Sequence, residues 1–185
     1  MIMHQQLKIV FTGPMGAGKT TAIRAISDGA PVSTDVGNSD QKTFAKESTT
    51  VALDYGELTL EDGASVHLYG TPGQARFSFM WEIIGRGALG VILLIDGSNP
   101  SALADLKAFI EAFQSHTPDQ PFVIGVGRLH SSGDMERYYR TLETVGLVAP
   151  VFAVDVRKKD DVLLLIETLL CILEMGVTEA ERAVS

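Results

Sequence analysis

The chain has 185 residues, 45% of them hydrophobic, and a formal net charge of −8 at pH 7. This size and apolar content predict one α/β domain, residues 1–185, with a well-filled core. The negative charge argues against a nucleic-acid-binding surface, which needs clustered lysine and arginine. No apolar stretch is long enough to span a membrane and no secretory signal is evident, so a cytoplasmic protein is expected. The single cysteine, Cys171, falls in an apolar helical pattern and is expected to be buried and reduced.

The most informative motif follows the first apolar run. Residues Gly13 to Thr20 read GPMGAGKT and match the pattern G-x-x-x-x-G-K-[ST] between a strand-like run and a helical pattern. Glycines let backbone N–H groups point at a phosphate, and the start of the helix adds its positive dipole end. A plain glycine-rich turn would give a similar match, but this context favours a nucleotide phosphate site. The residues assigned to it are Gly13, Pro14, Met15, Gly16, Ala17, Gly18, Lys19, Thr20 and Thr21.

Two side chains in this motif carry specific chemistry. Lys19 is expected to reach the β- and γ-phosphates, and the Thr20 hydroxyl is expected to bind Mg²⁺.

Apolar runs alternate with helical patterns along the rest of the chain, which indicates a mostly parallel sheet covered by helices on both faces. Residues 28–50 are polar and predict a long functional or disordered loop. Six strands are expected, at Leu7–Phe11, Val51–Leu60, Ser65–Tyr69, Leu89–Ile95, Phe122–Val126 and Val151–Val154. The second and third of these predict an antiparallel hairpin at one edge of the sheet. Helices are expected at Thr20–Ile26, Phe77–Arg86, Ser101–Phe113, Asp134–Glu143 and Asp161–Leu173.

A second element, GTPGQ, occupies Gly70 to Gln74 directly after a predicted strand. On its own it also fits an ordinary Pro-Gly turn. Together with GPMGAGKTT it resembles the Ras-like small GTPases, in which the corresponding turn reads D-T-P-G-Q or close to it. The resemblance implies a three-layer P-loop NTPase fold, GTP and GDP as ligands, and Mg²⁺ as cofactor. It also implies that the N–H of Gly73 meets the γ-phosphate and that Gln74 orients the attacking water.

One position departs from that family, because its Mg²⁺-associated aspartate is replaced here by Gly70. The bacterial MglA-type GTPases of gliding motility and cell polarity also lack this aspartate. The chain is similar to them in the Gly-Pro start of its phosphate loop and in the sequence HLY before the Pro-Gly-Gln turn. By that resemblance Thr50 caps the γ-phosphate and Mg²⁺, although Thr49 is its neighbour. Asp54 either supplies the missing carboxylate or is an exposed residue on an edge strand.

The same resemblance implies a rate of GTP hydrolysis and a protein partner. MglA-type proteins carry an arginine just before the switch threonine, where this chain has Thr49. An arginine that stabilises the transition state is worth roughly 10³ to 10⁵ in rate, so slow hydrolysis is expected, with Lys19, Gln74 and Thr50 at the phosphate. MglA-type GTPases pair with roadblock-fold proteins over their switches, and a partner of this kind is implied.

The residues that would read the base are less typical. Guanine is read in this family by N-K-x-D, where this chain has GRLH at Gly127 to His130. Arg128 can lie against a base as the lysine does, but His130 cannot accept two hydrogen bonds as a carboxylate does. Both also fit solvated loop residues, and nothing in the sequence recruits Asp134. A backbone N–H near Ala153 to Asp155 can meet the guanine O6. Guanine is favoured because of the switches, and adenine or no base selectivity is left open.

An apolar segment follows Gln74. It contains Phe77, Phe79, Met80, Trp81, Ile83 and Ile84. Some of these side chains must pack into the core, and others are expected to meet a regulatory partner. Two other functions remain open: a pseudo-GTPase scaffold that is nucleotide-free or permanently loaded, and an ATP-using P-loop kinase or ATPase. A kinase would use the arginine-bearing stretch from Gly127 to Arg140 as a lid.

Overall fold

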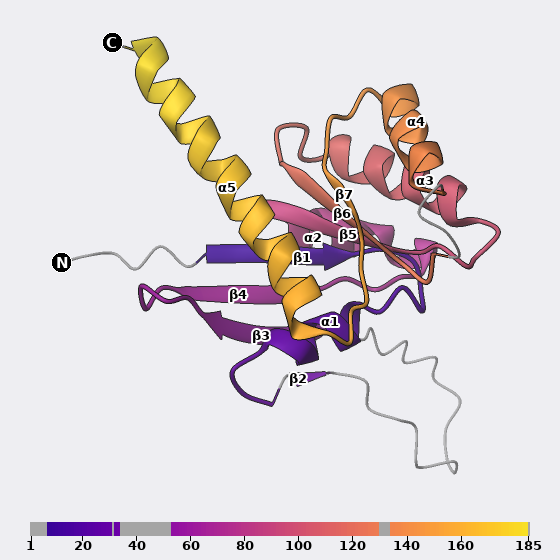
Figure 1. Cartoon of the computed structure of the whole chain (residues 1–185), viewed down its shortest axis with the longest axis horizontal. Coiled ribbons are helices and arrows are strands. Elements are labelled where there is room, and N and C mark those ends of the chain that lie inside the picture. The colour runs from indigo at the N-terminus through magenta and orange to yellow at the C-terminus, as the bar shows by residue number, and fades with distance from the viewer. Residues whose placement is uncertain (1–6, 31, 34–52, 130–133, 185) are drawn as a thin grey trace.

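The computed structural model describes residues 7–30, 32–33, 53–129 and 134–184, with all side chains in these ranges except those of residues 33, 75 and 177–184. Seven described strands form one sheet in the order β2-β3-β4-β1-β5-β6-β7 (Figure 1). They are β1 (Leu7–Thr12), β2 (Val32–Ser33), β3 (Asp54–Thr59), β4 (Ser65–Gly70), β5 (Gly90–Asp96), β6 (Phe122–Gly127) and β7 (Val151–Ala153). The helices are α1 (Lys19–Ile26), the 3₁₀ helix η1 (Ala75–Phe77), α2 (Ser78–Gly85), α3 (Ala102–Gln114), α4 (Met135–Val145) and α5 (Lys159–Val184).

Strand β1 lies at the centre of the sheet and pairs in parallel with both β4 and β5. Strands β6 and β7 continue the parallel part, whereas β3 pairs antiparallel with β4. The predicted α/β fold with an antiparallel hairpin is therefore confirmed. The seventh strand, β2, is a two-residue edge strand in the stretch predicted as a loop, and it pairs with Asp54 and Tyr55. So short a strand shows no alternation that a sequence could reveal.

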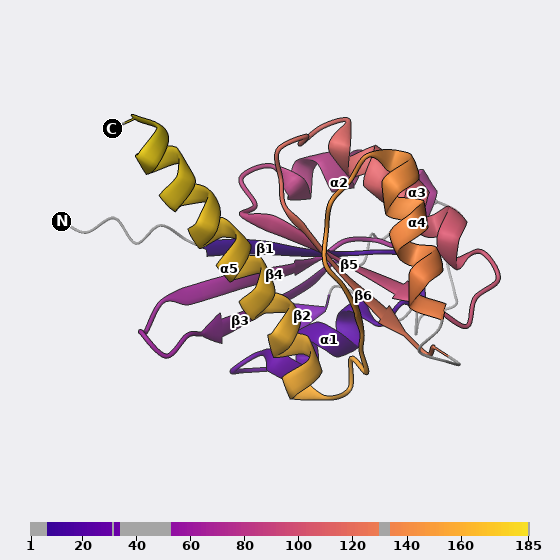
Figure 2. The ribbon, with the colours of Figure 1, turned by 45° about the horizontal axis from the view of Figure 1, so that its top comes forward.

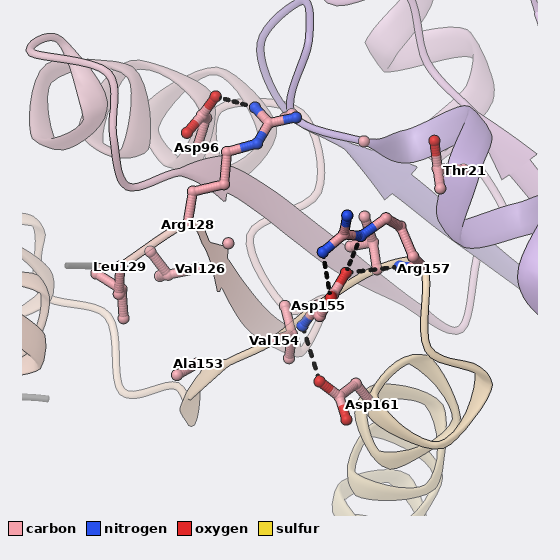
Figure 3. Close-up of a pocket in the computed structure, with 14 residues that line it drawn as sticks. Thr21, Asp96, Val126, Arg128, Leu129, Ala153, Val154, Asp155, Arg157 and Asp161 are labelled. Atoms are coloured by element: carbon pink, nitrogen blue, oxygen red, sulfur yellow. Dashed lines mark hydrogen bonds and ion pairs between the residues drawn. The ribbon is translucent and has the colours of Figure 1, made fainter. Parts of the chain in front are cut away.

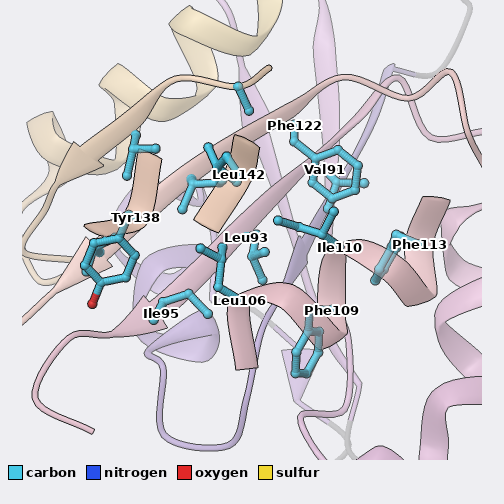
Figure 4. Packing of buried hydrophobic residues seen from close by; sticks show 14 of the residues in the cluster. Val91, Leu93, Ile95, Leu106, Phe109, Ile110, Phe113, Phe122, Tyr138 and Leu142 are labelled. Carbon is cyan, nitrogen blue, oxygen red and sulfur yellow. The ribbon is translucent and has the colours of Figure 1, made fainter. Parts of the chain in front are cut away.

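Helices cover both faces of the sheet (Figures 1 and 2). Strand β5 explains why, because its side chains alternate between two buried clusters. Val91, Leu93 and Ile95 pack with α2, α3 and α4, as Figure 4 shows for part of that cluster. Ile92 and Leu94 pack on the other face with α1 and α5. A strand buried on both faces must be apolar at every position, as the run Leu89–Ile95 predicts.

Helix α5 is much longer than the predicted Asp161–Leu173. Its buried positions include Val162 and Leu169, and its far end extends beyond the sheet (Figures 1 and 2). The prediction that Cys171 is buried is wrong, because the thiol is exposed. Cys171 lies nine residues after Val162, which at 3.6 residues per turn puts it on the opposite side of the helix. Among the described residues, no helix is long and apolar enough to cross a membrane.

The parallel strands all end at the same edge of the sheet. The loops that follow β1, β4, β5, β6 and β7 therefore meet there, and in open α/β sheets this edge is where ligands bind.

Candidate functional site

The phosphate-loop motif connects β1 to α1 at the carboxyl edge of the sheet. Gly13 has a φ of 133°, and a Cβ at this position would lie 2.1 Å from the carbonyl oxygen of Leu94 on β5. Only glycine fits both the backbone conformation and this close approach. Helix α1 begins at Lys19 with no acidic residue in its first turn, so its positive dipole end faces the loop unopposed by a carboxylate of its own.

Lys19 is buried, with only 8% of its surface exposed. Its ammonium group donates to the carbonyl oxygens of Gly13, at 2.7 Å, and Pro14, at 2.8 Å. Burial lowers the pKa of Lys19 to about 8, and the nearby charge of Asp54 offsets part of that effect. The loop thus holds a poorly solvated cation that an incoming anion would stabilise in its charged form.

Thr20, the next residue, donates its hydroxyl to Oδ2 of Asp54 at 2.5 Å. Asp54 opens β3 and is paired across the hairpin with Gly70 on β4. A Cβ placed on Gly70 would lie 2.9 Å from the Cβ of Asp54 and 3.2 Å from Oδ2. The carboxylate of Asp54 therefore lies in the space that a side chain at position 70 would need. Of the two interpretations of Asp54, the geometry favours the one in which its carboxylate belongs to the site.

The turn after β4 packs directly against the phosphate loop. Thr71 donates its N–H to the carbonyl of Phe11 at 2.9 Å, and its hydroxyl is hydrogen-bonded to that of Thr12 at 2.8 Å. A Cβ on Gly73 would lie 2.4 Å from the backbone nitrogen of Met15. Position 73 must therefore be glycine for the two loops to meet this closely.

The same turn is anchored from α2. The indole N–H of Trp81 donates to the carbonyl of Pro72 at 2.8 Å. The indole ring stacks on Phe109 of α3, with the two centroids 4.3 Å apart. Gln74 contacts the phosphate loop through Nε2, which lies 3.7 Å from Sδ of Met15. One aromatic side chain thus links the turn to the core of the helical layer.

Beside the phosphate loop lies a cavity of about 550 Å³ (Figure 3). Its walls come from the phosphate loop and the start of α1 (Ala17, Gly18 and Thr21), the end of β5 (Asp96), residues 126–129 at the end of β6 and after it, residues 153–157 at the end of β7 and after it, and Asp161 in the first turn of α5. A Cβ on Gly18 would lie 2.7 Å from Cγ2 of Val156, so the phosphate loop and the loop after β7 are in close contact. The size and position suit a small ligand that also reaches the phosphate loop.

Two ion pairs line this cavity (Figure 3). Arg128, which has a φ of 53°, donates to Oδ2 of Asp96, while the N–H and hydroxyl of Ser98 donate to Oδ1 at 3.0 and 2.6 Å. Burial raises the pKa of Asp96, but the hydrogen bonds from Ser98 and Arg128 outweigh it and hold that pKa below its usual value. This carboxylate is ionised at neutral pH.

The second pair lies in the loop between β7 and α5. Arg157 donates Nε to Oδ1 of Asp155 at 2.8 Å and Nη2 to Oδ2 at 2.7 Å. These hydrogen bonds lower the pKa of Asp155 to about 2. The backbone N–H of Asp155, one of those in the stretch Ala153 to Asp155 from which the sequence predicts a contact to guanine O6, donates instead to Asp161 Oδ2 at 2.8 Å. This donor is therefore already engaged.

The structure brings the phosphate loop, Asp54, Gly73 and Gln74 to one region, with Arg128 and Asp155 in the adjoining cavity. Thr50 and His130 lie outside the described residues. The sequence reasoning missed Asp96, Arg157 and Asp161. Asp96 ends the apolar run of β5, and a charged residue at the end of a central strand was the available signal. Within the described chain, no group of three or more histidine, cysteine or acidic side chains forms a metal cluster.

Comparison with known proteins identifies relatives. A family model described as "Conserved hypothetical ATP binding protein" matches residues 30–146, more than half of the chain. The chain belongs to this family. The matched region begins after the phosphate loop and ends before β7, so it includes the turn after β4 and the loop after β6.

Individual relatives include small GTPases. The chain is 31% identical to the Ras-related protein Rab-40A-like of Homo sapiens over 126 residues, which are 67% of this chain and 41% of that protein. It is 27% identical to the Ras-related protein RAB1BV of Beta vulgaris over 141 residues, 75% of this chain and 59% of that protein. An uncharacterized protein of Methanocaldococcus jannaschii is 34% identical over 93 residues, 50% of this chain and 53% of that protein. The chain spans about half the length of these relatives, and its fold is the Ras-like P-loop fold.

Proposed function

We propose that this protein is a nucleotide-dependent molecular switch that binds GTP and GDP with Mg²⁺ and hydrolyses GTP slowly. The observation that carries the proposal is the close packing of Gly73 against the phosphate loop. A ligand phosphate at Lys19 would contact both the phosphate loop and the turn after β4. Binding or loss of that phosphate would therefore change the contacts of the turn. Contact between a phosphate and a mobile switch segment is the usual basis of such proteins.

The oxygen donors around Thr20 fit Mg²⁺, which is usually held by one or two carboxylates together with substrate phosphates. The Thr20 hydroxyl and the Asp54 carboxylate are already in contact, 2.5 Å apart. In the proposal these two residues hold the ion, with Thr50 from the segment outside the described residues. Bound Mg²⁺ would neutralise charge on the phosphates.

The chain's own residues would perform the remaining steps. Lys19 would stabilise negative charge on the β- and γ-phosphates, and its low pKa would rise on contact with them. Gln74 would orient the attacking water, and the N–H of Gly73 would meet the γ-phosphate. Arg76, the cation next to this turn, lies 4.8 Å from the ring of Phe77 and is not directed at the phosphate loop by any described contact. Slow turnover is expected because Thr49 stands where MglA-type proteins carry an arginine.

The base is proposed to occupy the cavity beyond the loop, with Arg128 against one of its faces. Within this proposal the chain is an MglA-type GTPase, as its local sequence suggests. A second candidate is an ATP-binding protein, which the description of its family favours.

A regulatory partner is proposed to dock over the switch region. In helix α2 and at the residue before it, three side chains are buried: Phe77, Trp81 and Ile84. Two others are exposed, Phe79 by 59% and Ile83 by 62%. Their exposure supports a contact surface beside the phosphate loop, and a roadblock-fold protein is the partner that the resemblance implies.

The test is nucleotide binding by protein that has been stripped of any ligand. Fluorescent GDP, GTP, ADP and ATP analogues are titrated with Mg²⁺, and GTP turnover is followed by phosphate release. The proposal expects tight guanine-nucleotide binding, slow turnover, and loss of both in Lys19→Ala. Tighter binding of the adenine pair would support the second candidate, and no binding of any nucleotide would support a scaffold.

A further inference from the structure

The cavity contains more than one acidic group that a base can meet. Among its described lining residues, three are carboxylates: Asp96, Asp155 and Asp161. Guanine differs from adenine in presenting two adjacent donors, N1–H and N2–H, which one carboxylate can accept together. His130 cannot do this. Base selection by this cavity therefore depends on which of the three carboxylates is available to accept hydrogen bonds from the base.

Each of these carboxylates accepts one backbone N–H, and for Asp155 the donor is the N–H of Arg157, 3.1 Å from Oδ1. Asp161 accepts the N–H of Asp155, which fixes the start of α5 against the loop. Asp96 accepts the N–H and hydroxyl of Ser98 on one oxygen and Arg128 on the other. The bonds from Ser98 cannot be released without rebuilding the turn after β5.

Asp155 differs because only the single backbone bond to Oδ1 would remain if the side chain of Arg157 left, whereas Oδ1 of Asp96 would keep both donors of Ser98. Both of its oxygens face the side chain of Arg157, which is 79% exposed and belongs to a neighbouring position of the same loop. Nε and Nη2 of Arg157 form a two-donor fork on the carboxylate, one N–H to each oxygen, at 2.8 and 2.7 Å. A fork of this kind is the bidentate geometry that arginine forms with carboxylates.

The guanine edge has the same chemistry as that fork. N1, C2 and N2 of guanine are a guanidine built into a ring, with two N–H groups side by side. Arg157 therefore stands where such an edge would bind. Adenine offers a lone pair at N1 in place of one N–H, which would face the carboxylate charge.

We propose that Asp155 is the residue that selects guanine, accepting N1–H and N2–H in place of the fork of Arg157. This inference rests on the proposed nucleotide-binding function. Arg157, once displaced, is free to lie against the base, since guanidinium groups stack on aromatic faces. The acceptor on this loop compensates for the histidine at position 130. The low pKa of Asp155, which its contact with Arg157 maintains, keeps it a pure acceptor before the base arrives.

The test changes the acceptor pattern and asks whether the preferred base changes with it. In Asp155→Asn the amide keeps an acceptor for N1–H and gains a donor, which suits xanthine, whose C2 carries an oxygen. Affinities for GDP, XDP and ADP are measured by competition against a fluorescent nucleotide. The wild type is expected to prefer GDP to XDP, and Asp155→Asn to reverse that preference. The wild type should bind GDP about 10- to 100-fold more tightly than XDP, which is the range of a bidentate base contact. Asp155→Asn should bind XDP more tightly than GDP by a similar factor.

Two matched variants make the same chemical change elsewhere. Asp134→Asn alters a carboxylate that does not line the cavity, and Asp96→Asn alters one that does. Both are expected to keep the GDP preference, whatever Asp96→Asn does to overall affinity. The gain of XDP binding requires a folded protein, so it separates base selection from misfolding.

The outcomes distinguish this inference from the proposed function. If the wild type prefers GDP to ADP but Asp155→Asn keeps that preference over XDP, the switch survives and the role of Asp155 is overturned. That role is also overturned if Asp96→Asn gains XDP binding, or if Asp155→Asn loses all nucleotides equally. If the wild type prefers ADP, both the guanine switch and the inference fail.

Discussion

The carboxylate of Asp54 fills the space into which a side chain at Gly70 would project. The two residues are directly paired across β3 and β4, and Oδ2 of Asp54 lies 3.2 Å from where a Cβ on Gly70 would be. Directly opposite residues usually keep their Cβ atoms about 4.5–5.5 Å apart. A Cβ on Gly70 would lie only 2.9 Å from that of Asp54, so the two side chains would be too close here. The carboxylate of Asp54 lies 2.5 Å from the Thr20 hydroxyl, and in the proposed function it supplies the acidic group that Gly70 lacks.

The first prediction concerns variants that move the carboxylate from position 54 to position 70. Asp54→Ala removes the carboxylate and is expected to weaken Mg²⁺-dependent GDP binding by roughly 10- to 100-fold. Adding Gly70→Asp to that variant returns a carboxylate to the vacated space and should recover part of the loss. Gly70→Asp alone should reduce stability, because its Cβ would lie 2.9 Å from that of Asp54 and the two acids would repel each other.

A double-mutant cycle of Mg²⁺ titrations, read by fluorescent GDP, measures the coupling between the two sites. Glu61→Ala, which removes an exposed acid in the hairpin turn, serves as the control and should bind as the wild type does. Strictly additive effects of Asp54→Ala and Gly70→Asp would mean that the two positions do not share a role.

The second prediction concerns the contact between the turn and the phosphate loop. In Gly73→Ala the new methyl group would meet backbone atoms of Pro14 and Met15, which cannot move aside as a flexible side chain can. Overpacking of this kind costs about 1–3 kcal/mol, so the free energy of unfolding should fall by that amount. Since Trp81 is the only tryptophan and is bonded to Pro72 in the same turn, its emission should also change.

Gly29→Ala is the matched control, because a Cβ at Gly29 would meet nothing within 4 Å. It should leave the emission of Trp81 and the unfolding midpoint in denaturant close to those of the wild type. If Gly73→Ala behaves like Gly29→Ala in both measurements, the turn and the phosphate loop are not in the contact described above.

The third prediction separates binding from turnover. Gln74→Leu should bind GTP as the wild type does but hydrolyse it about 10²-fold more slowly, because misplacing a reacting group by about an ångström has an effect of that size. Single-turnover release of phosphate measures the chemical step directly. Gln114→Leu, at the last residue of α3, makes the same substitution away from the site. Equal turnover in the two variants would remove Gln74 from the mechanism.

Strong local patterns made most of the fold predictable. The apolar run that became β5 is buried at six consecutive positions, and burial on both faces leaves no other composition open to a central strand. The phosphate loop was equally readable, since its three glycines adopt a positive φ and Gly13 also approaches β5 closely. The burial of Cys171 was predicted wrongly because Cys171 lies on the side of α5 that faces away from the sheet, which an apolar helical run does not reveal.

The base-binding part of the site was less predictable from the sequence. That Arg157 folds back on Asp155 depends on the conformation of one short loop, which has no periodic pattern. The pairing of Arg128 with Asp96 joins strand ends 32 positions apart in the chain. Thr50 and His130, which lie outside the described residues, stay predictions.

The last prediction is that Lys19 lowers the stability of the fold but is needed for nucleotide binding. A lysine pKa lowered from 10.5 to about 8 by burial corresponds to a destabilisation of about 3 kcal/mol at neutral pH. Lys19→Met removes the buried charge but also the hydrogen bonds to Gly13 and Pro14, so a net gain of about 1–3 kcal/mol in unfolding free energy is expected at pH 7. The same variant should no longer bind nucleotide.

The pH dependence of that gain identifies its cause. Between pH 8 and 10.5 the unfolded wild type binds more protons than the folded protein, so wild-type stability rises with pH relative to Lys19→Met. The advantage of the variant should therefore be full below pH 8 and shrink as the pH approaches 10.5. Urea denaturation across this range measures it, with Lys107→Met, at an exposed lysine, as the control that should show no gain. A gain that does not change with pH would mean that packing, rather than the buried charge, limits the stability of the phosphate loop.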